Sequence, residues 1–174
     1  MTNDTATAAL SSTTMDSPVG ELTLVASAAG LRAVLFPGER PDRVTVGPIA
    51  NTDPAADEVL DRAVQQLREY FAGERRTFDL PLDPVGTDFQ QQAWMELRHI
   101  PYGQTISYGE QAKRLGDVRK SRAVGAANGR NPIGIIVPCH RVVGSGGALT
   151  GFGGGLEAKA WLLRHEAGVS DLGL

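Results

Sequence analysis

The two halves of the chain follow different hydrophobic patterns, and the change falls near residues 81–86. Residues 13–36 alternate short apolar runs with turn signals, which predicts three strands, at 13–15, 21–26 and 31–36. Asp53-Pro54 is expected to open a helix that stops at Gly73. Its inner face is expected to carry Leu60, Val64, Leu67 and Phe71. With a further short strand expected at 77–80, this half is predicted to be a small sheet with a helix.

The second half is predicted to be mainly helical. Thr87 with Gln90, and Ser107 with Glu110, have the spacing of a capping box, so helices are expected over about 87–99 and 107–116. Asp117 is expected to cap a third helix over about 119–128. Two short helices joined by a tight glycine-containing turn indicate a helix-turn-helix. A last helix is expected over 156–166, its inner face formed by Leu156, Ala160 and Leu163.

These patterns predict how the 174 residues are organised. We expect a disordered tail at 1–12, an N-terminal domain at 13–80, a linker at 81–86 and a C-terminal domain at 87–170. The first residues lack the pattern of a signal peptide, and no window approaches the roughly 18 apolar residues of a membrane span. A cytoplasmic protein is therefore expected.

Charge is distributed unevenly along the chain. The formal net charge is −3, but residues 1–84 hold 7 Lys and Arg against 13 Asp and Glu, whereas residues 85–174 hold 10 against 7. An electrostatically driven nucleic-acid binder usually has a larger basic excess. Any polyanionic partner is therefore expected on the C-terminal half.

The lone cysteine, Cys139, follows an apolar run at 133–137 that is predicted to be a buried strand or extended segment. One cysteine excludes an intrachain disulfide and a multi-thiolate zinc site. A free thiol titrates near pH ~8.5, so a nucleophilic one needs a base. His140 is adjacent, but sequence neighbours point apart, which favours a bridging water over direct contact. Glu166 is one of twenty acidic residues that could orient the histidine.

Residues 144–155 contain seven glycines. They do not complete the G-x-G-x-x-G pattern, because Leu stands at positions 149 and 156, so a dinucleotide-binding loop is rejected. A flexible hairpin and a loop packed close to a ligand both remain open.

The segment from Asn131-Pro132 through residues 135–143, with Pro138-Cys139-His140-Arg141 at its centre, resembles the signature of the methylated-DNA–protein-cysteine methyltransferases, or O6-alkylguanine-DNA alkyltransferases. The resemblance runs from about Thr87 to Glu166, through 106–108, 122–125 and 153–154, and is looser in the first half. It implies an α+β fold. The N-terminal part would be a ribonuclease-H-like sheet with a helix, and the C-terminal part a winged-helix-like helical domain with the helix-turn-helix.

The resemblance also implies a reaction and a set of roles. An alkyl group would pass once, irreversibly, from O6-alkylguanine in duplex DNA to Cys139, with no cofactor and no metal. His140 would take the thiol proton through a water, and Glu166 would fix its tautomer. Asn131 would support the turn before the cysteine, and Tyr108 would donate to N3 of the leaving guanine. The other implied substrate contacts are Val142, Phe152, Gly153 and Gly154.

Arg122 is implied to fill the gap left by a flipped base. Ala123 and Ala126 would allow the third helix into a minor groove about 6 Å wide, narrower than a helix of about 10–12 Å. The plainer alternatives are an exposed helix charge for Arg122 and tight helix packing for the alanines. The implied contacts to DNA also include Arg119, Lys120, Ser121 and Arg130.

Three positions depart from the pattern of the family. Phe152 stands where Tyr is common, Gly153 where some members have Ser, and Gly134 where some have Pro. None belongs to the Cys139–His140–Glu166 set, so the departures bear on substrate preference rather than on the chemistry. A lesion-binding protein without transfer is the main alternative function, and a Cys-His hydrolase ranks far below it. O4-alkylthymine as a second substrate and cooperative assembly of a monomer on DNA are left open.

Overall fold

A computed structural model describes residues 9–40 and 42–168. The chain divides into two compact units, which are described separately. The N-terminal unit comprises Met1–Pro37 and Thr45–Val85, and the C-terminal unit comprises Gly38–Val44 and Gly86–Leu174. Residues 38–44 therefore lie with the C-terminal unit, although the sequence pattern grouped them with the N-terminal domain. No helix of the described residues is long and apolar enough to cross a membrane.

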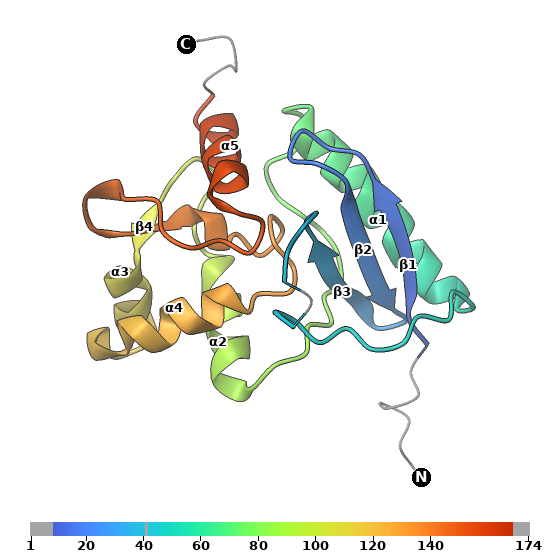
Figure 1. The fold of residues 1–174 in the computed structure, drawn as a ribbon, viewed down its shortest axis with the longest axis horizontal. Helices are drawn as coiled ribbons and strands as arrows, with labels where there is room; N and C mark the ends of the chain where they lie inside the picture. Colours follow the sequence, from blue (N-terminus) through green and yellow to red (C-terminus); the bar gives the residue numbers. More distant parts are fainter. Residues whose placement is uncertain (1–8, 41, 169–174) are drawn as a thin grey trace. The chain divides into compact units, whose positions relative to one another are not determined.

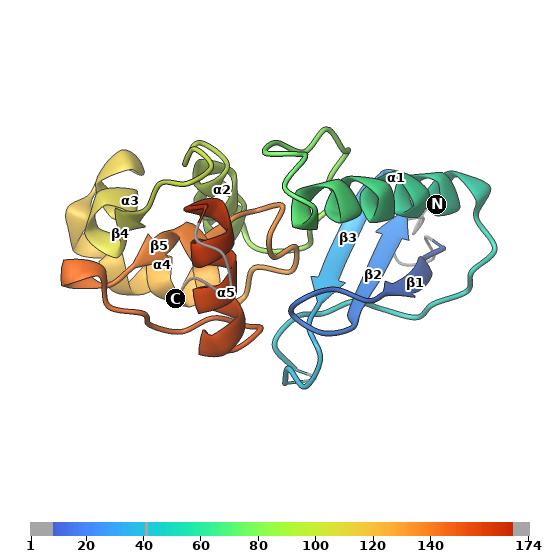
Figure 2. The same ribbon diagram turned by 90° about the horizontal axis from the view of Figure 1, so that it is seen from above.

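The N-terminal unit is a three-stranded antiparallel sheet with one helix along a face (Figures 1 and 2). Its strands are β1 (Ser11–Met15), β2 (Leu22–Ser27) and β3 (Gly30–Leu35), in the order β1-β2-β3. The helix α1 (Pro54–Phe71) starts as expected, since the Asp53 side chain accepts hydrogen bonds from the amides of Ala55 and Ala56. The three predicted strands and the helix are confirmed, with ends shifted by one or two residues.

Three expectations for this half are wrong in detail. Leu10 is buried and β1 begins at Ser11, so residues 10–12 are not a tail; residues 1–8 lie outside the described part. Residues 77–80 form no strand; instead Leu82 makes an isolated parallel bridge to Leu31. On α1, Val64 and Phe71 are only half-buried, because they lie at the edge of the buried face rather than at its centre. That face consists of Ala56, Val59, Leu60, Ala63, Gln66, Leu67 and Tyr70.

The C-terminal unit is built from short helices around a small parallel β pair. Its helices are α2 (Asp88–Leu97), α3 (Tyr108–Arg114), α4 (Ser121–Gly129) and α5 (Leu156–Glu166). Its 3-10 turns are η1 (Val118–Lys120), η2 (Cys139–Arg141) and η3 (Ser145–Gly147). Strands β4 (Ile106–Ser107) and β5 (Val142–Val143) pair in parallel, with Ile106 opposite Val142. This pairing joins the start of α3 to the segment that follows the cysteine.

The predicted helix-turn-helix is present as α3, η1 and α4. Thr87 forms the expected capping box of α2, and the Ser107 side chain caps α3 by accepting from the amide of Glu110. Asp117 caps the turn η1 rather than α4, so the third predicted helix is split at Ser121. Across the pair, Gln111 and Asn128 exchange two buried amide hydrogen bonds of 2.8 and 3.1 Å. This exchange fixes how α4 lies against α3.

Two further expectations for this half are corrected. Residues 133–137 form a buried turn and not a strand; Ile135 has a φ of 73°, and the amide of Val137 donates to the carbonyl of Ile133 at 2.9 Å. In α5 the buried residues are Ala158, Lys159, Leu162 and Glu166, whereas Leu156 is 49% exposed. The stripe was misassigned because two of its true members are charged, and charged residues are rarely buried unless they are paired.

Candidate active site

Cys139 opens the turn η2 and is buried. The Asn131 side chain supports the preceding turn, because its amide donates to the carbonyl of Val137 at 2.8 Å and its oxygen accepts from the amide of Ile133 at 3.0 Å. Burial raises the pKa of the Cys139 thiol, while a hydrogen bond from Asn131 and the charges of Arg43 and Lys159 act to lower it. Burial has the larger effect, so the resting group is a neutral thiol that needs a base to remove its proton.

His140 and Glu166 meet as the resemblance implied. The His140 ring is fully buried, and its Nε2 lies 2.7 Å from Oε2 of Glu166. Arg141 holds the same carboxylate from the other side, with Nε donating to Oε1 at 2.7 Å and Nη2 to Oε2 at 3.0 Å. Burial opposes the charge on Glu166, but the hydrogen bonds from His140 and Arg141 outweigh it and hold the pKa of Glu166 below its ordinary value. The carboxylate is thus ionised at neutral pH.

The hydrogen bond to this carboxylate decides which ring nitrogen of His140 is free. An ionised carboxylate only accepts, so Nε2 carries the proton and Nδ1 is an acceptor. Nδ1 is buried and has no hydrogen-bond partner among the described residues, so the thiol of Cys139 does not reach it directly. Burial also lowers the pKa of His140, which keeps the ring neutral. A neutral, oriented imidazole with an open acceptor is what a general base requires.

Lys159 belongs to the site, although the sequence analysis did not select it. It is fully buried, and its Nζ donates to the carbonyls of Val142 and Thr150, each at 2.7 Å. It therefore ties the segment after the cysteine to the glycine-rich loop. Burial lowers the pKa of Lys159. One signal was available: Lys159, Leu162 and Glu166 are spaced i, i+3, i+7, as on one helix face.

The residues expected to contact the substrate lie around this network. The Tyr108 hydroxyl, at the start of α3, accepts a hydrogen bond of 3.0 Å from Oγ1 of Thr150. The Phe152 ring meets the His140 ring edge-on, with centroids 6.5 Å apart. Val142 is buried, and its carbonyl already accepts from Lys159. Gly153 lies so close to Arg43 that an added Cβ would fall 2.5 Å from Cζ of the guanidinium.

On α4, the small side chains face outward. Arg122, Ala123 and Ala126 are exposed, whereas Val124 and Ala127 are buried. Tight packing inside the unit therefore does not explain Ala123 and Ala126, and the alternative reading of these two alanines is wrong. An exposed face of small residues is what a helix needs to approach another large surface closely.

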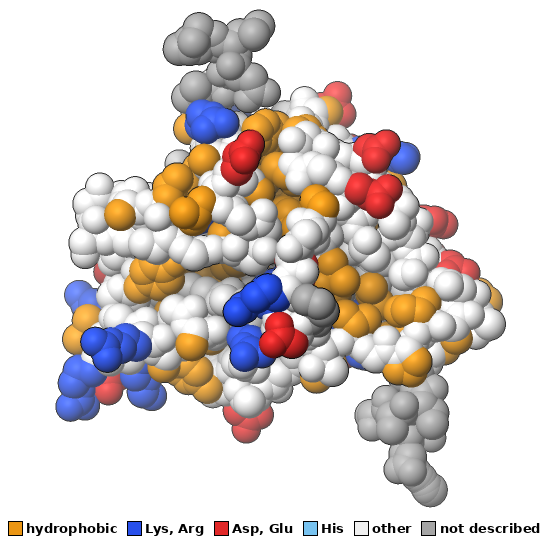
Figure 3. All heavy atoms as spheres, viewed as in Figure 1, with side chains coloured by type: hydrophobic (Ala, Val, Ile, Leu, Met, Phe, Trp, Pro, Cys, Tyr) orange, Lys and Arg blue, Asp and Glu red, His pale blue; other side chains and the backbone are white. Residues whose placement is uncertain are grey.

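Positive side chains gather over α3, η1 and the start of α4 (Figure 3). Several already contact other groups of the chain. Arg119 pairs with Asp117 at 3.1 Å, and Nζ of Lys120 lies 5.7 Å from the centroid of the Phe89 ring. Arg130 donates to the carbonyl of Asp42 at 3.3 Å, and the Ser121 hydroxyl donates to the carbonyl of Val118 at 2.9 Å. Arg122, the second residue of α4, is exposed.

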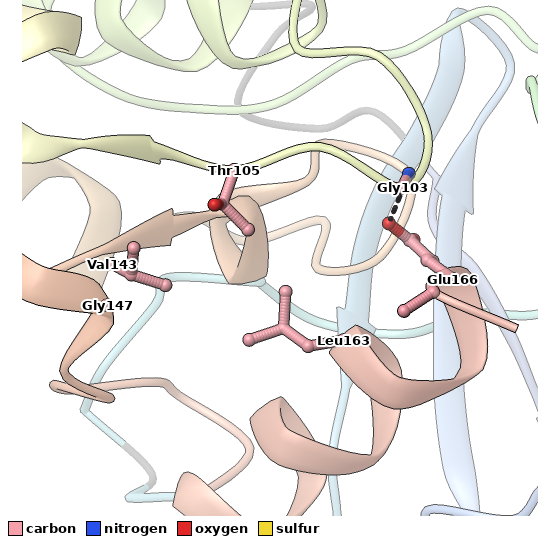
Figure 4. Close-up of a pocket in the computed structure, with 7 residues that line it drawn as sticks. Gly103, Thr105, Val143, Gly147, Leu163 and Glu166 are labelled. Carbon is pink, nitrogen blue, oxygen red and sulfur yellow. Dashed lines mark hydrogen bonds between the residues drawn. The ribbon is translucent and has the colours of Figure 1, made fainter. Parts of the chain in front are cut away.

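A cavity of about 250 Å³ lies beside Glu166 (Figure 4). Thr105, Val143, Leu163 and Glu166 line it, and the amide of Gly103 points to Oε1 of Glu166 at 3.5 Å. Its walls include none of the residues expected to contact the substrate. Of the expected catalytic and substrate-contacting residues, the cavity therefore shares only Glu166 with the candidate alkyl-acceptor site.

Comparison with known proteins agrees with this geometry. Residues 10–84 match the family described as the ribonuclease-like domain of 6-O-methylguanine DNA methyltransferase, and residues 88–168 match its DNA binding domain. A methylated-DNA–protein-cysteine methyltransferase of Methanosarcina acetivorans is 47% identical over 152 residues, which covers 87% of this chain and 94% of that protein. The chain belongs to the methylated-DNA–protein-cysteine methyltransferase family.

Solved structures of this methyltransferase family have the same fold. The Mycobacterium tuberculosis O6-methylguanine methyltransferase is 47% identical and superposes with a TM-score of 0.78, covering 94% of this chain and 96% of that one. A Mycobacterium tuberculosis relative in complex with DNA has a TM-score of 0.77 at 48% identity, covering 89% and 91% of the two chains. The predicted α+β class with a ribonuclease-like and a DNA-binding part is confirmed.

Proposed function

We propose that this chain repairs DNA by moving an alkyl group from O6 of a guanine in duplex DNA to Sγ of Cys139. The sulfur–carbon bond forms as the carbon–O6 bond breaks, and guanine is restored. The thioether has no ready leaving path, so each molecule acts once. The observation that carries the proposal is the buried Cys139 beside a neutral His140 whose Nε2 is engaged by Glu166 and whose Nδ1 is open.

The thiol proton passes to Nδ1 of His140 through a bridging water. Adjacent residues present their side chains in different directions, and the open buried Nδ1 gives such a water one of its partners. As the ring becomes charged, the carboxylate of Glu166 stabilises it at 2.7 Å. Asn131 supports the turn that presents the thiol. The reaction uses no cofactor.

The flipped guanine is held by groups around the glycine-rich loop. Tyr108 donates to N3 of the leaving base, while main-chain groups of Val142, Gly153 and Gly154 contact its edge and O6. The Phe152 ring forms an apolar wall next to His140. Since Phe152 has no hydroxyl, this wall makes shape contacts only.

DNA binds over α4, which enters the minor groove with Ala123 and Ala126 toward the duplex. Arg122 occupies the space of the flipped base. Phosphates are contacted by Arg119, Lys120, Ser121 and Arg130 of the same surface. In this proposal residues 87–170 form the DNA-binding and alkyl-acceptor domain, residues 13–80 the N-terminal domain, and a monomer acts in the cytoplasm.

Mass spectrometry of the intact protein tests the transfer. Incubation with duplex DNA that carries O6-methylguanine should add one methyl group per molecule, and peptide mapping should place it on Cys139. Undamaged duplex is the control. Binding without a mass gain would replace transfer by lesion recognition alone, and repeated turnover on an ester would indicate a hydrolase; either result contradicts the proposal.

A further inference from the structure

A buried arginine of the C-terminal unit comes from a distant part of the sequence. Arg43 lies in the segment Gly38–Val44 and is 7% exposed. Its Nη1 donates to the carbonyl of Asn131 at 2.8 Å and to that of Gly129 at 3.2 Å. Nε and Nη2 face the carboxylate of Glu39, with the shortest distance 3.0 Å. The guanidinium is thus engaged on both sides and its charge is compensated.

These contacts fasten the segment to the end of α4. Gly129 is the last residue of that helix, and a cation at the final carbonyls of a helix is favourable. Arg130, just after α4, binds the segment in turn, since its Nη1 donates to the carbonyls of Asp42 and Arg43 at 3.3 and 3.5 Å. The end of α4 and the segment are therefore held by two arginines that point in opposite directions.

The Arg43 guanidinium also occupies the space that a side chain at position 153 would need. A Cβ on Gly153 would lie 2.5 Å from Cζ, 2.7 Å from Nε and 2.8 Å from Nη1 of Arg43. Gly151 and Gly155 differ, because they have φ values of +21° and +93° and an added Cβ meets nothing within 4 Å. Gly153 is thus required by space and not by a left-handed backbone.

We propose that Arg43 is a positioning residue for alkyl transfer, which sets the glycine-rich loop at Gly153 against the end of α4 and the Asn131 turn. The inference rests on the proposed function, in which main-chain groups near Gly153 face O6 of the base. Arg43 contacts three parts that must be in register: α4 on the DNA, the turn that presents Cys139, and the loop at O6. Its charge also acts to lower the pKa of Cys139.

A double-mutant cycle tests the contact. Gly153→Ala should lower the melting temperature by roughly 5 °C through overpacking. In the Arg43→Ala background the same change should cost little, because the guanidinium has gone. Equal losses in the two backgrounds would overturn the contact. If R43A does not fold, Arg43→Gln with Glu39→Gln replaces it, because that pair leaves no unpaired buried charge.

The single-turnover rate at saturating O6-methylguanine duplex tests the role. At a temperature where every variant is folded, R43A should react about 10-fold more slowly. Arg43→Lys should recover only part of the rate, since an ammonium cannot reach both carbonyls and Glu39 in one plane. Arg40→Ala, an exposed arginine of the same segment, is the matched control and should react at the wild-type rate.

The outcomes separate the two proposals. Wild-type transfer with an unchanged saturated rate in R43A would overturn the positioning role alone, since a merely structural role lowers only the melting temperature. Absence of transfer in the wild-type protein would overturn the proposed function, and the positioning role with it.

Discussion

Glu166 illustrates how much a single residue depends on its partners. A buried carboxylate is costly unless it is compensated, and here His140 and Arg141 share its two oxygens at 2.7–3.0 Å. Arg141 also donates to the carbonyl of Ile100 at 2.7 Å, which fixes the position of its guanidinium. Because Arg141 supplies a permanent positive charge, Glu166 stays ionised while His140 stays neutral. The histidine is therefore ready to accept a proton.

Replacing Cys139 by Ser tests the acceptor. An alcohol is far less acidic than a thiol, so Cys139→Ser should abolish methyl transfer. Binding to undamaged duplex should stay within about twofold, because the change is nearly isosteric and Cys139 is buried. A mass shift assay and a gel-shift titration measure the two effects. Retained transfer in C139S would refute the assignment.

The pH dependence of transfer tests the base. Burial lowers the pKa of His140, so the rate should fall on the acid side only below the ordinary value of about 6.5. Burial raises the pKa of Cys139, and proton removal by His140 makes a preformed thiolate unnecessary. A plateau is expected from about pH 6.5 to 8.5. A rate that rises tenfold per pH unit across this window would show that His140 is not the base.

Among the elements of the fold, the proposed DNA contact falls on α4. Its buried side holds Val124, Ala127 and Asn128, with the Ala127 carbonyl accepting from Nε1 of Trp94 at 2.8 Å. The exposed side of α4 carries, beside Arg122, the small side chains of Ala123 and Ala126. A helix fixed so firmly from behind presents one surface to the duplex with little loss of conformational freedom on binding.

Arg122→Ala should impair base extrusion without unfolding the helix. Alanine favours helix and Arg122 is exposed, so the melting temperature should change by less than about 2 °C. The rate of transfer from duplex DNA should fall about 10-fold or more, because the flipped base no longer has a replacement in the stack. Lys113→Ala on α3 is the control. If the rate fell only because less of the variant is folded, Arg122 would be a plain surface charge with no role in base extrusion.

Ala126→Leu tests the close approach of α4 to DNA. Leucine is a good helix former and position 126 is exposed, so the fold should tolerate it. The larger side chain should weaken binding to duplex DNA at least about 10-fold by blocking the groove. Fluorescence anisotropy with a labelled duplex measures the change. Unaltered affinity would place DNA on another surface.

For the whole molecule, buried charge in the C-terminal unit links stability to pH. The pKa values of His140 and Glu166 are both lowered in the folded state, so each group binds protons more readily when unfolded. The stability that these two groups contribute should therefore be complete above about pH 6.5 and fall as pH drops, first through His140 and then, below about 4.3, through Glu166. Melting temperatures from pH 8 to 4 measure the fall. Glu166→Gln should flatten the most acidic part of the curve, and an unchanged slope would contradict the linkage.

The sequence by itself determined what depends on neighbouring residues. Caps at Asp53, Thr87 and Ser107 marked helix starts, alternation marked the strands, and the segment around Cys139 carried the resemblance to the family. These signals are local, because caps and periodic patterns act within one or two turns of chain. The same locality explains the errors, since the turn at 133–137 and the choice of the buried face of α5 depend on what lies against them.

The family resemblance implied the pairing of His140 with Glu166, but only the tertiary structure showed the other partners of the buried charged groups. Glu166 meets His140 from 26 residues away and Arg43 meets Asn131 from 88 residues away, and no short pattern encodes such distances. The helical spacing of Lys159 could have placed it on the buried face, but its carbonyl partners come from the fold, and a buried cation is tolerated only where such groups receive it. Residue types and local order follow from the sequence, whereas the pairing of buried charges follows from packing the whole unit.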